Sequence, residues 1–205
     1  MPRSPGPRGE YAKTAKRRQE IVAAAFDVFA RHGYPNSTMS QIAKRAGMTM
    51  PGVTHHFPTK SALVEAVLRE RDLDSQSHLE GRRGLSVLQG LMENADRDEH
   101  EDGLTQLFTI LAAEGTGKDH PAHAYLRHRY ELILSAVQRA FEEAQADGDL
   151  VSGVVPAEAA QVYAALSDGL QLQHLYDVGQ VSQTALMRRF LDGMLITPVD
   201  GAAGS

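Results

Sequence analysis

The stretch from Ser40 to Lys60, SQIAKRAGMTMPGVTHHFPTK, has the pattern of two short helices joined by a tight turn. Thr38 and Gln41 lie three residues apart and form a capping box, which predicts where the first of these helices begins. Gly47 can adopt the left-handed conformation that commonly ends a helix. The turn between the two helices is therefore predicted to be only a few residues long.

The second helix is predicted to expose a polar face. Thr49 is a good N-cap, and Pro51 is tolerated in the first turn because the N–H that a proline lacks would be unpaired there. Apolar residues recur at helical spacing on one face of each helix, and the other faces carry Lys44, Arg45, Thr49, Met50, Thr54, His55 and His56. Two short helices around a Gly-containing turn are typical of a helix-turn-helix that reads the DNA major groove.

A longer motif surrounds this stretch. It reads Ile42-Ala43-x-x-Ala46-Gly47-x-Thr49, then Val53-x-x-His56-Phe57-x-x-Lys60, and upstream Ile21-x-x-Ala24-Ala25-x-x-x-Phe29-x-x-x-Gly33-Tyr34. This pattern resembles the N-terminal DNA-binding domain of TetR-type (TetR/AcrR) transcriptional regulators. Thr54 departs from it, because such regulators usually carry an aromatic residue there, so a phenol that could contact the DNA backbone is missing.

The candidate DNA-binding residues follow from these helices. Thr38 and Lys60 begin helices, where backbone N–H groups together with a hydroxyl or an ammonium can meet phosphates. Base contacts are expected from the second helix, where Gly52 would allow close approach. The full predicted set is Thr38, Thr49, Met50, Pro51, Gly52, Val53, Thr54, His55, His56 and Lys60.

Charge is distributed unevenly along the chain. Residues 1–60 contain 10 Lys or Arg and 3 Asp or Glu, a balance of +7, whereas the other 145 residues balance at −12, which together give the net charge of −5. Such asymmetry indicates a module that faces nucleic acid attached to an acidic body.

Composition excludes several classes of protein. The chain has no cysteine, so it can form neither disulfides nor a thiolate metal site. No apolar run approaches the length of a membrane span, and no apolar segment follows the basic N-terminus to make a secretory signal. We expect a cytoplasmic protein that does not bind membranes.

The remaining pattern is helical, so the predicted fold class is all-α: an N-terminal three-helix helix-turn-helix domain followed by a C-terminal helical bundle. We expect a disordered basic arm at 1–13, the DNA-binding domain at 14–76, an effector-binding and dimerisation domain at 77–197, and a disordered tail at 198–205. The first helix is predicted at 14–32, and the last two at 156–178 and 183–196.

The last two helices mix small and apolar residues over more than one face, which suits either the chain's own core or a second copy. The resemblance implies a dimer built from two such helices of each subunit, and a two-fold dimer suits a palindromic operator. The predicted interface residues are Tyr163, Leu166, Leu170, Leu186, Phe190 and Met194.

A bundle of this kind can also enclose a small apolar ligand. Candidate lining residues are aromatic or isolated polar groups on inward faces, together with one leucine: Phe108, Leu111, Tyr125, His128, Arg129 and His174. For each of them an ordinary place in the core or on the surface is an equal alternative.

Metal and catalytic sites are not predicted. His120 and His123 lie close in sequence, but Pro121 places His120 outside the following helix, and His128 lies five positions beyond His123, so the three do not form one row. No Gly-x-Ser-x-Gly, His-Glu-x-x-His or Gly-rich dinucleotide motif occurs. We expect no metal, no cofactor and no enzymatic activity.

The sequence thus predicts a ligand-responsive transcriptional regulator, specifically a repressor, which binds double-stranded operator DNA as a homodimer and is released by a small-molecule effector. Two alternatives remain open. One is a DNA-binding or scaffold protein without an effector, and the other is an all-α enzyme or metal-binding protein with a basic tail.

Overall fold

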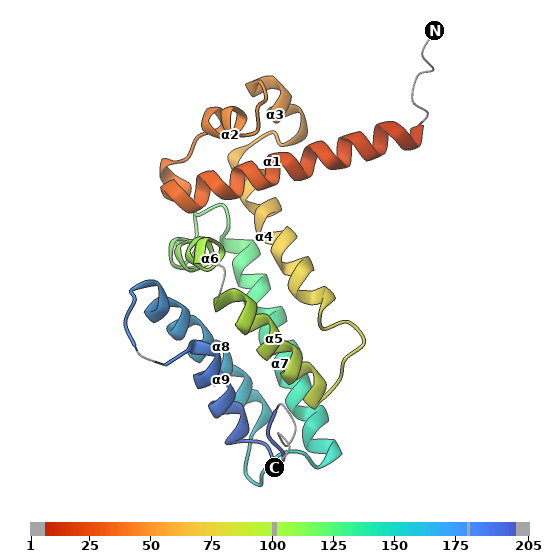
Figure 1. Cartoon of the computed structure of the whole chain (residues 1–205), viewed down its shortest axis with the longest axis vertical. Helices are drawn as coiled ribbons and strands as arrows, with labels where there is room; N and C mark the ends of the chain where they lie inside the picture. The colour runs from red at the N-terminus through yellow and green to blue at the C-terminus, as the bar shows by residue number, and fades with distance from the viewer. Residues whose placement is uncertain (1–6, 100–101, 180, 200–205) are drawn as a thin grey trace. The chain divides into compact units, whose positions relative to one another are not determined.

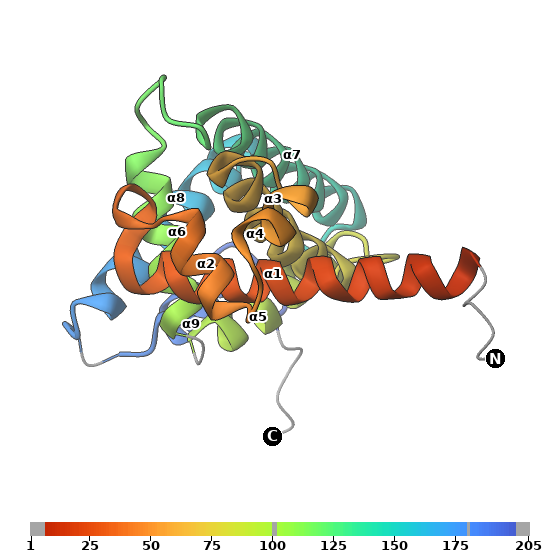
Figure 2. The ribbon, with the colours of Figure 1, turned by 90° about the horizontal axis from the view of Figure 1, so that it is seen from above.

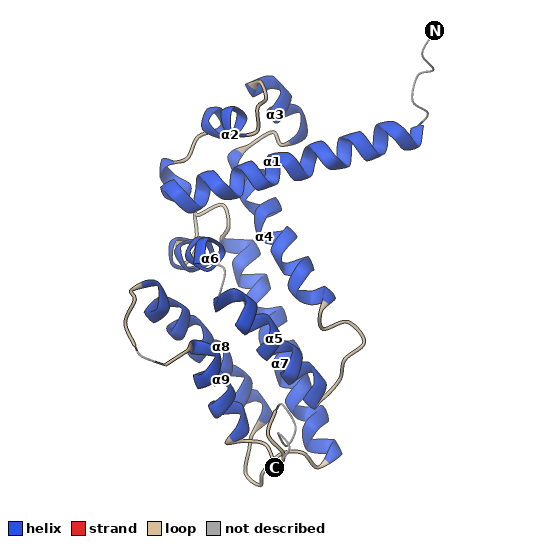
Figure 3. Cartoon of the chain, viewed as in Figure 1, coloured by secondary structure: helices blue, strands red, loops and turns tan. Residues whose placement is uncertain are grey.

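The computed structural model describes residues 7–99, 102–179 and 181–199. Every regular element within these ranges is a helix, which confirms the all-α fold (Figure 3). None of the helices described is long and apolar enough to cross a membrane. The chain divides into two compact units, Met1–Arg71 and Asp72–Ser205, so the division falls five residues before the predicted boundary at 76.

The first unit contains α1 (Pro7–Asn36), α2 (Met39–Arg45), α3 (Met50–His56) and the beginning of α4 (Lys60–Ser77) (Figure 1). Side chains from all four helices form its core, and the fully buried ones are Ile21, Ala25, Phe29, Ile42, Val53, Leu63, Val64 and Leu68. The two short helices α2 and α3 therefore pack on α1 and on the beginning of α4.

Helix α1 begins earlier than the sequence predicted. It starts at Pro7, so the prediction of a disordered arm is wrong for residues 7–13, while residues 1–6 lie outside the described ranges. Proline is well tolerated at the first helical position, and most of the residues that follow are good helix formers. The N-terminal turns of α1 extend beyond α2 and α3 (Figures 1 and 2).

The second unit is a bundle of α5 (Leu85–Glu99), α6 (Asp102–Glu114), α7 (His123–Asp147), α8 (Pro156–Leu175) and α9 (Gln183–Asp192). Its core is built largely from α7, α8 and α9, around Phe141, Ala160 and Leu191. Gly148 ends α7 with a φ of 84°, a left-handed conformation that costs glycine little.

The C-terminal segment differs from the prediction. Helix α9 ends at Asp192, four residues before the predicted end at Ile196, because Leu195 instead pairs in an isolated bridge with Leu150. Val199 is fully buried and its N–H donates to Asp192 Oδ1 at 2.8 Å, so the prediction of a disordered tail is wrong at this residue. Residues 200–205 lie outside the described ranges.

Candidate nucleic-acid interface

The start of α2 is held by the predicted capping box. Thr38 Oγ1 accepts a hydrogen bond from Gln41 N–H at 3.2 Å, and Gln41 Oε1 accepts one from Thr38 N–H at 2.8 Å. Gly47 then takes a φ of 64° in the turn, as predicted. Thr49 Oγ1 accepts from Gly52 N–H at 3.3 Å and so caps α3. Local polar contacts therefore fix both ends of the turn.

The outward face of α3 carries most of the predicted base-reading residues. Met50 is 45% exposed, and Pro51 and His55 are exposed as well. Thr54 is half-buried, and its hydroxyl donates to the carbonyls of Met50 and Pro51, both at 3.2 Å. Its oxygen keeps a lone pair that can accept a further hydrogen bond.

Val53 does not belong to this face. Its side chain is fully buried, so the prediction that it contacts a base is wrong. The side chain instead anchors α3 in the core of the unit. Gly52 lies at the start of the helix, where an added Cβ would come within 3.2 Å of Met48 Cε and Thr49 Oγ1.

Helix α1 supports both short helices through contacts that the sequence analysis missed. Arg18 Nη1 donates to the carbonyl of His56 at 2.8 Å, and its guanidinium lies 4.2 Å from the centre of the Phe57 ring. Arg45 Nε donates to Asp27 Oδ2 at 2.7 Å, which joins α2 to α1. One signal was present for Arg18, because it precedes Ile21 by three residues and so extends the apolar stripe of α1.

His56 lies in a positively charged environment. Partial burial, the neighbouring His55 ring and the guanidinium groups of Arg18 and Arg17 together lower the pKa of His56 below its usual value. The rings of His55 and His56 meet edge to face, with 5.3 Å between their centroids. The C-terminal end of α3 thus gathers cationic and imidazole groups.

Lys60 does not point away from the unit as a phosphate contact requires. Its ammonium donates to the carbonyls of Tyr34 at 2.7 Å, Ser37 at 2.9 Å and Pro35 at 3.4 Å. In the structure the ammonium of Lys60 is therefore hydrogen-bonded within the unit, whereas the sequence predicted that it contacts a DNA phosphate.

The candidate ligand residues only partly come together. Asp72 Oδ2 accepts from the Tyr125 hydroxyl at 2.6 Å and Asp72 Oδ1 accepts from Arg129 Nε at 2.7 Å, while the guanidinium of Arg129 lies 5.3 Å from the centre of the Phe108 ring. Leu111 is fully buried. No local sequence pattern points to Asp72, because its partners lie more than 50 positions away in the chain.

The two histidines among these candidates lie elsewhere. The side chain of His128 is 67% exposed and its Nδ1 lies 3.8 Å from Glu131 Oε2, so His128 is a surface residue and not an inward-facing one. His174 is partly buried on α8.

The predicted interface residues divide into two groups. Tyr163 and Leu170 are 6% and 7% exposed, so they belong to the chain's own core and offer almost no surface to a second copy. Partly buried positions at the edge of that core are Leu166, Leu186, Phe190 and Met194. The exposed large apolar residues of α8 are instead Val162 and Leu172, at 49% and 46%.

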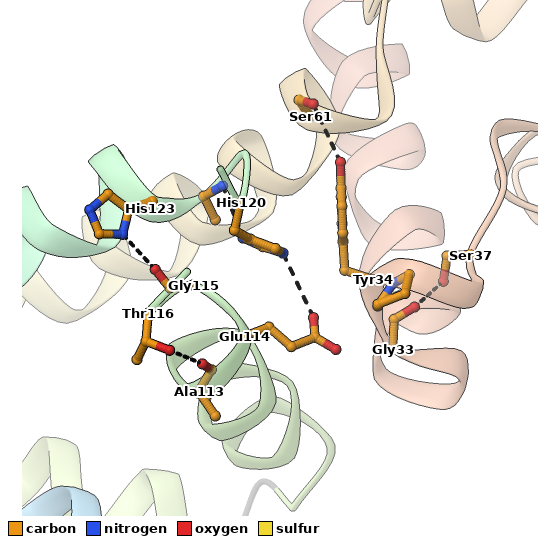
Figure 4. Close-up of polar contacts among 12 residues, drawn as sticks. Gly33, Tyr34, Ser37, Ser61, Ala113, Glu114, Gly115, Thr116, His120 and His123 are labelled. Atoms are coloured by element: carbon orange, nitrogen blue, oxygen red, sulfur yellow. Dashed lines mark hydrogen bonds and ion pairs between the residues drawn. The ribbon is translucent and has the colours of Figure 1, made fainter. Parts of the chain in front are cut away.

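The histidines near the start of α7 have separate partners. His123 Nδ1 lies 2.7 Å from the carbonyl of Gly115, and His120 Nε2 lies 3.8 Å from Glu114 Oε2 (Figure 4). Across the residues that the structure describes, no group of three His, Asp or Glu side chains could hold a metal ion.

Comparison with known proteins agrees with this geometry. Residues 21–67 match the profile of bacterial regulatory proteins of the tetR family, and residues 84–196 match that of the C-terminal domain of BetI-type transcriptional repressors. The chain is 27% identical over 171 residues to the A-factor receptor protein of Streptomyces griseus, which covers 83% of this chain but only 59% of that protein.

Solved structures show the same fold. Salmonella enterica GusR superposes with a TM-score of 0.70 at 27% identity and covers 87% of this chain and 94% of its own. A SmeT–triclosan complex superposes with a TM-score of 0.77 at 19% identity, with coverages of 90% and 94%. With its N-terminal helix-turn-helix and a C-terminal domain that matches over most of its length, this chain belongs to the TetR family of bacterial transcriptional regulators.

Proposed function

We propose that this regulator is a repressor that binds a palindromic operator as a homodimer and leaves it when a small molecule binds the second unit. The observation that carries the proposal is the outward face of α3, which presents Met50, Pro51, Thr54 and His55. On the opposite face, the buried side chain of Val53 fixes the helix in the core. A short rigid helix with exposed methyl, hydroxyl and imidazole groups suits the major groove.

Dimerisation is supported by the surface of α8. Val162, Ala165, Gly169 and Leu172 recur at intervals of three and four residues, so they lie along one stripe of the helix. An added Cβ at Gly169 would meet nothing within 4 Å, so the backbone there is open to close approach. A stripe of this kind suits the same stripe of a second copy across a two-fold axis.

An effector is supported by the contacts around Asp72. An aromatic ring, a guanidinium, a carboxylate and a phenol from α4, α6 and α7 converge there. Helix α4 contributes residues to both units, so a ligand that displaces Asp72 would act on the helix that also carries Leu63 and Val64. One similar structure is a complex with triclosan, and one relative is named as a receptor.

The first experiment identifies the operator. Genomic DNA fragments retained by the purified protein are sequenced, and we expect a shared two-fold sequence whose half-sites lie one helical turn apart, about 34–36 Å. If the retained fragments share no sequence, the proposal that the protein binds a specific operator is contradicted.

The second experiment tests the effector. A compound that weakens operator binding must bind more weakly to the operator complex by the same factor, typically about 5- to 150-fold. Equal affinity for the free and DNA-bound protein would exclude that compound as an inducer. If no compound from a broad screen shows this linkage, the alternative of a DNA-binding protein without an effector is favoured.

A further inference from the structure

Lys60 lies at the first position of α4, and its ammonium is surrounded by the turn that connects α1 to α2. The three oxygens it meets belong to Tyr34, Pro35 and Ser37, at 2.7, 3.4 and 2.9 Å. The ammonium also lies 4.2 Å from the centre of the Tyr34 ring. A lysine has three N–H donors, so these carbonyls can use all of them.

The turn needs such a cation. Helix α1 is interrupted at Gly33, which has a φ of 69°, and the carbonyls at the end of a helix lack intrahelical partners and carry partial negative charge. Ser37 Oγ satisfies the carbonyl of Gly33 at 2.6 Å (Figure 4). Lys60 satisfies the carbonyls that follow.

The Tyr34 ring completes the environment of Lys60. Its side chain is 8% exposed, and its hydroxyl lies 3.3 Å from Ser61 Oγ, the residue after Lys60 (Figure 4). A cation against an aromatic face in a partly buried site is attracted more strongly than one in water.

This turn leads directly into Thr38, the N-cap of α2. The carbonyl of Ser37, which Lys60 holds, belongs to the same peptide unit as the Thr38 N–H that donates to Gln41 Oε1. The position of that peptide therefore depends on Lys60, and the start of α2 and its exposed Thr38 hydroxyl depend on the peptide.

We propose that Lys60 is a positioning residue that holds the α1–α2 turn and through it Thr38, and that it does not itself bind a DNA phosphate. The DNA-binding part of its test rests on the proposed function, whereas the stability part does not.

The test compares Lys60→Met with wild type, and Lys118→Met, at an exposed lysine in the α6–α7 loop, is the matched control. Loss of three charge-assisted hydrogen bonds should lower the melting temperature by about 3–8 °C. Operator affinity measured well below this temperature should fall, with an unchanged slope of log affinity against log salt. The control should change neither quantity.

A phosphate contact predicts a different result, because each neutralised phosphate contributes about 0.9 to the salt slope. A slope lower by that amount in Lys60→Met would overturn the proposal whatever the melting temperature. If Lys60→Met does not fold, Lys60→Arg decides. Arginine binds phosphates at least as well as lysine, but its planar fork cannot direct three N–H groups at carbonyls around one point. Full affinity and stability in Lys60→Arg would then reject the positioning role.

A double-mutant cycle with Thr38→Ala separates positioning from mere stability. If Lys60 acts through Thr38, the combined loss of operator affinity should be smaller than the product of the two single losses. Independent losses would overturn the positioning role. If the wild-type protein shows no salt-dependent operator binding, the proposed function fails. The stability measurement still tests Lys60 in that case, because an unchanged melting temperature in Lys60→Met would show that its contacts do not stabilise the fold.

Discussion

Arg18 Nη1 donates a 2.8 Å hydrogen bond to the carbonyl of His56, so the first helix of the chain holds the last residue of α3. The same guanidinium stacks on Phe57, the C-cap residue of α3. A cation at the C-terminal end of a helix is favourable because the unpaired carbonyls carry partial negative charge. The orientation of the proposed reading helix therefore depends on a residue outside the helix-turn-helix.

Arg18→Met should lower the free energy of unfolding by about 1–2 kcal/mol, through loss of the charge-assisted hydrogen bond and the ring contact. It should also weaken operator binding. Arg17→Met removes the same charge but breaks only an exposed pair with Glu20, so its stability should change by less than about 0.5 kcal/mol. Urea unfolding and DNA titration of both variants make the comparison. If both variants lose the same stability and the same operator affinity, the loss of charge alone accounts for the effect of Arg18→Met.

His56 should make stability depend on pH. Its pKa is lowered in the folded protein, so the unfolded chain binds more protons as the pH falls through the ordinary pKa of 6.5 toward the folded value. Stability should therefore fall over that interval as the solution is acidified, and His56→Gln should reduce the loss. The same substitution at exposed His128 is the control, followed by urea unfolding between about pH 7 and pH 5. A pH profile unchanged by His56→Gln would contradict this cause.

Glu99 stabilises the start of α9. Its carboxylate accepts from Ser182 Oγ at 2.9 Å and from the N–H groups of Gln183 and Thr184 at 3.2 and 3.1 Å. Burial opposes ionisation, but these hydrogen bonds outweigh it and lower the pKa of Glu99 below its usual value.

The contribution of Glu99 should thus be complete above pH 4.5 and should be lost as the pH falls through the lower folded pKa. Glu99→Gln should cost about 1–2 kcal/mol at pH 7, measured by urea unfolding, and less in acid. A cost that does not shrink in acid would mean that Glu99 acts through packing and not through charge.

Asp72 is the charged centre of the contacts between α4 and α7. Its side chain is 16% exposed, and that of Arg129 is 23% exposed. Asp72→Asn should destabilise the second unit by about 2–4 kcal/mol because it leaves a largely buried guanidinium unpaired. Tyr125→Phe removes one hydrogen bond and should cost about 1 kcal/mol.

Adding Arg129→Met to Asp72→Asn provides the internal check. The second change removes the unpaired charge, so the double variant should be more stable than Asp72→Asn alone, as measured by thermal unfolding. A double variant that is less stable still would show that packing dominates at this position.

The proposed dimer surface on α8 can be tested by introducing negatively charged residues into it. Val162→Asp and Leu172→Asp together should yield a monomer in analytical ultracentrifugation, because each would place a carboxylate opposite its own copy. The fold should persist, since both side chains are exposed in the single chain. Leu132→Asp, at an equally exposed position on α7, should leave the dimer intact. A dimer that survives the double substitution would place the interface elsewhere.

The sequence predicted those structural features that depend on residues close together in the chain. The Thr38–Gln41 capping box and the glycine turn at Gly47 are local, and both were confirmed. The spacing of Val53 and Phe57 placed Val53 on the apolar face of its helix, and the structure buries it fully, so only its inclusion among the base-contacting residues was wrong. The contact between Arg18 and His56 joins positions 38 residues apart, and a pattern read over neighbouring residues cannot predict such a contact.

The helical start of α1 changes how quickly the protein could find its operator. A flexible basic arm must give up about 1–2 kcal/mol of backbone entropy per residue when it settles into a groove. A preformed helix that extends past α2 and α3 and carries exposed Lys13 and Lys16 gives up little of this entropy. Long-range attraction to phosphates raises the association rate more than the lifetime of the complex. We therefore expect this segment to govern the speed of capture, while α3 governs how long the complex lasts.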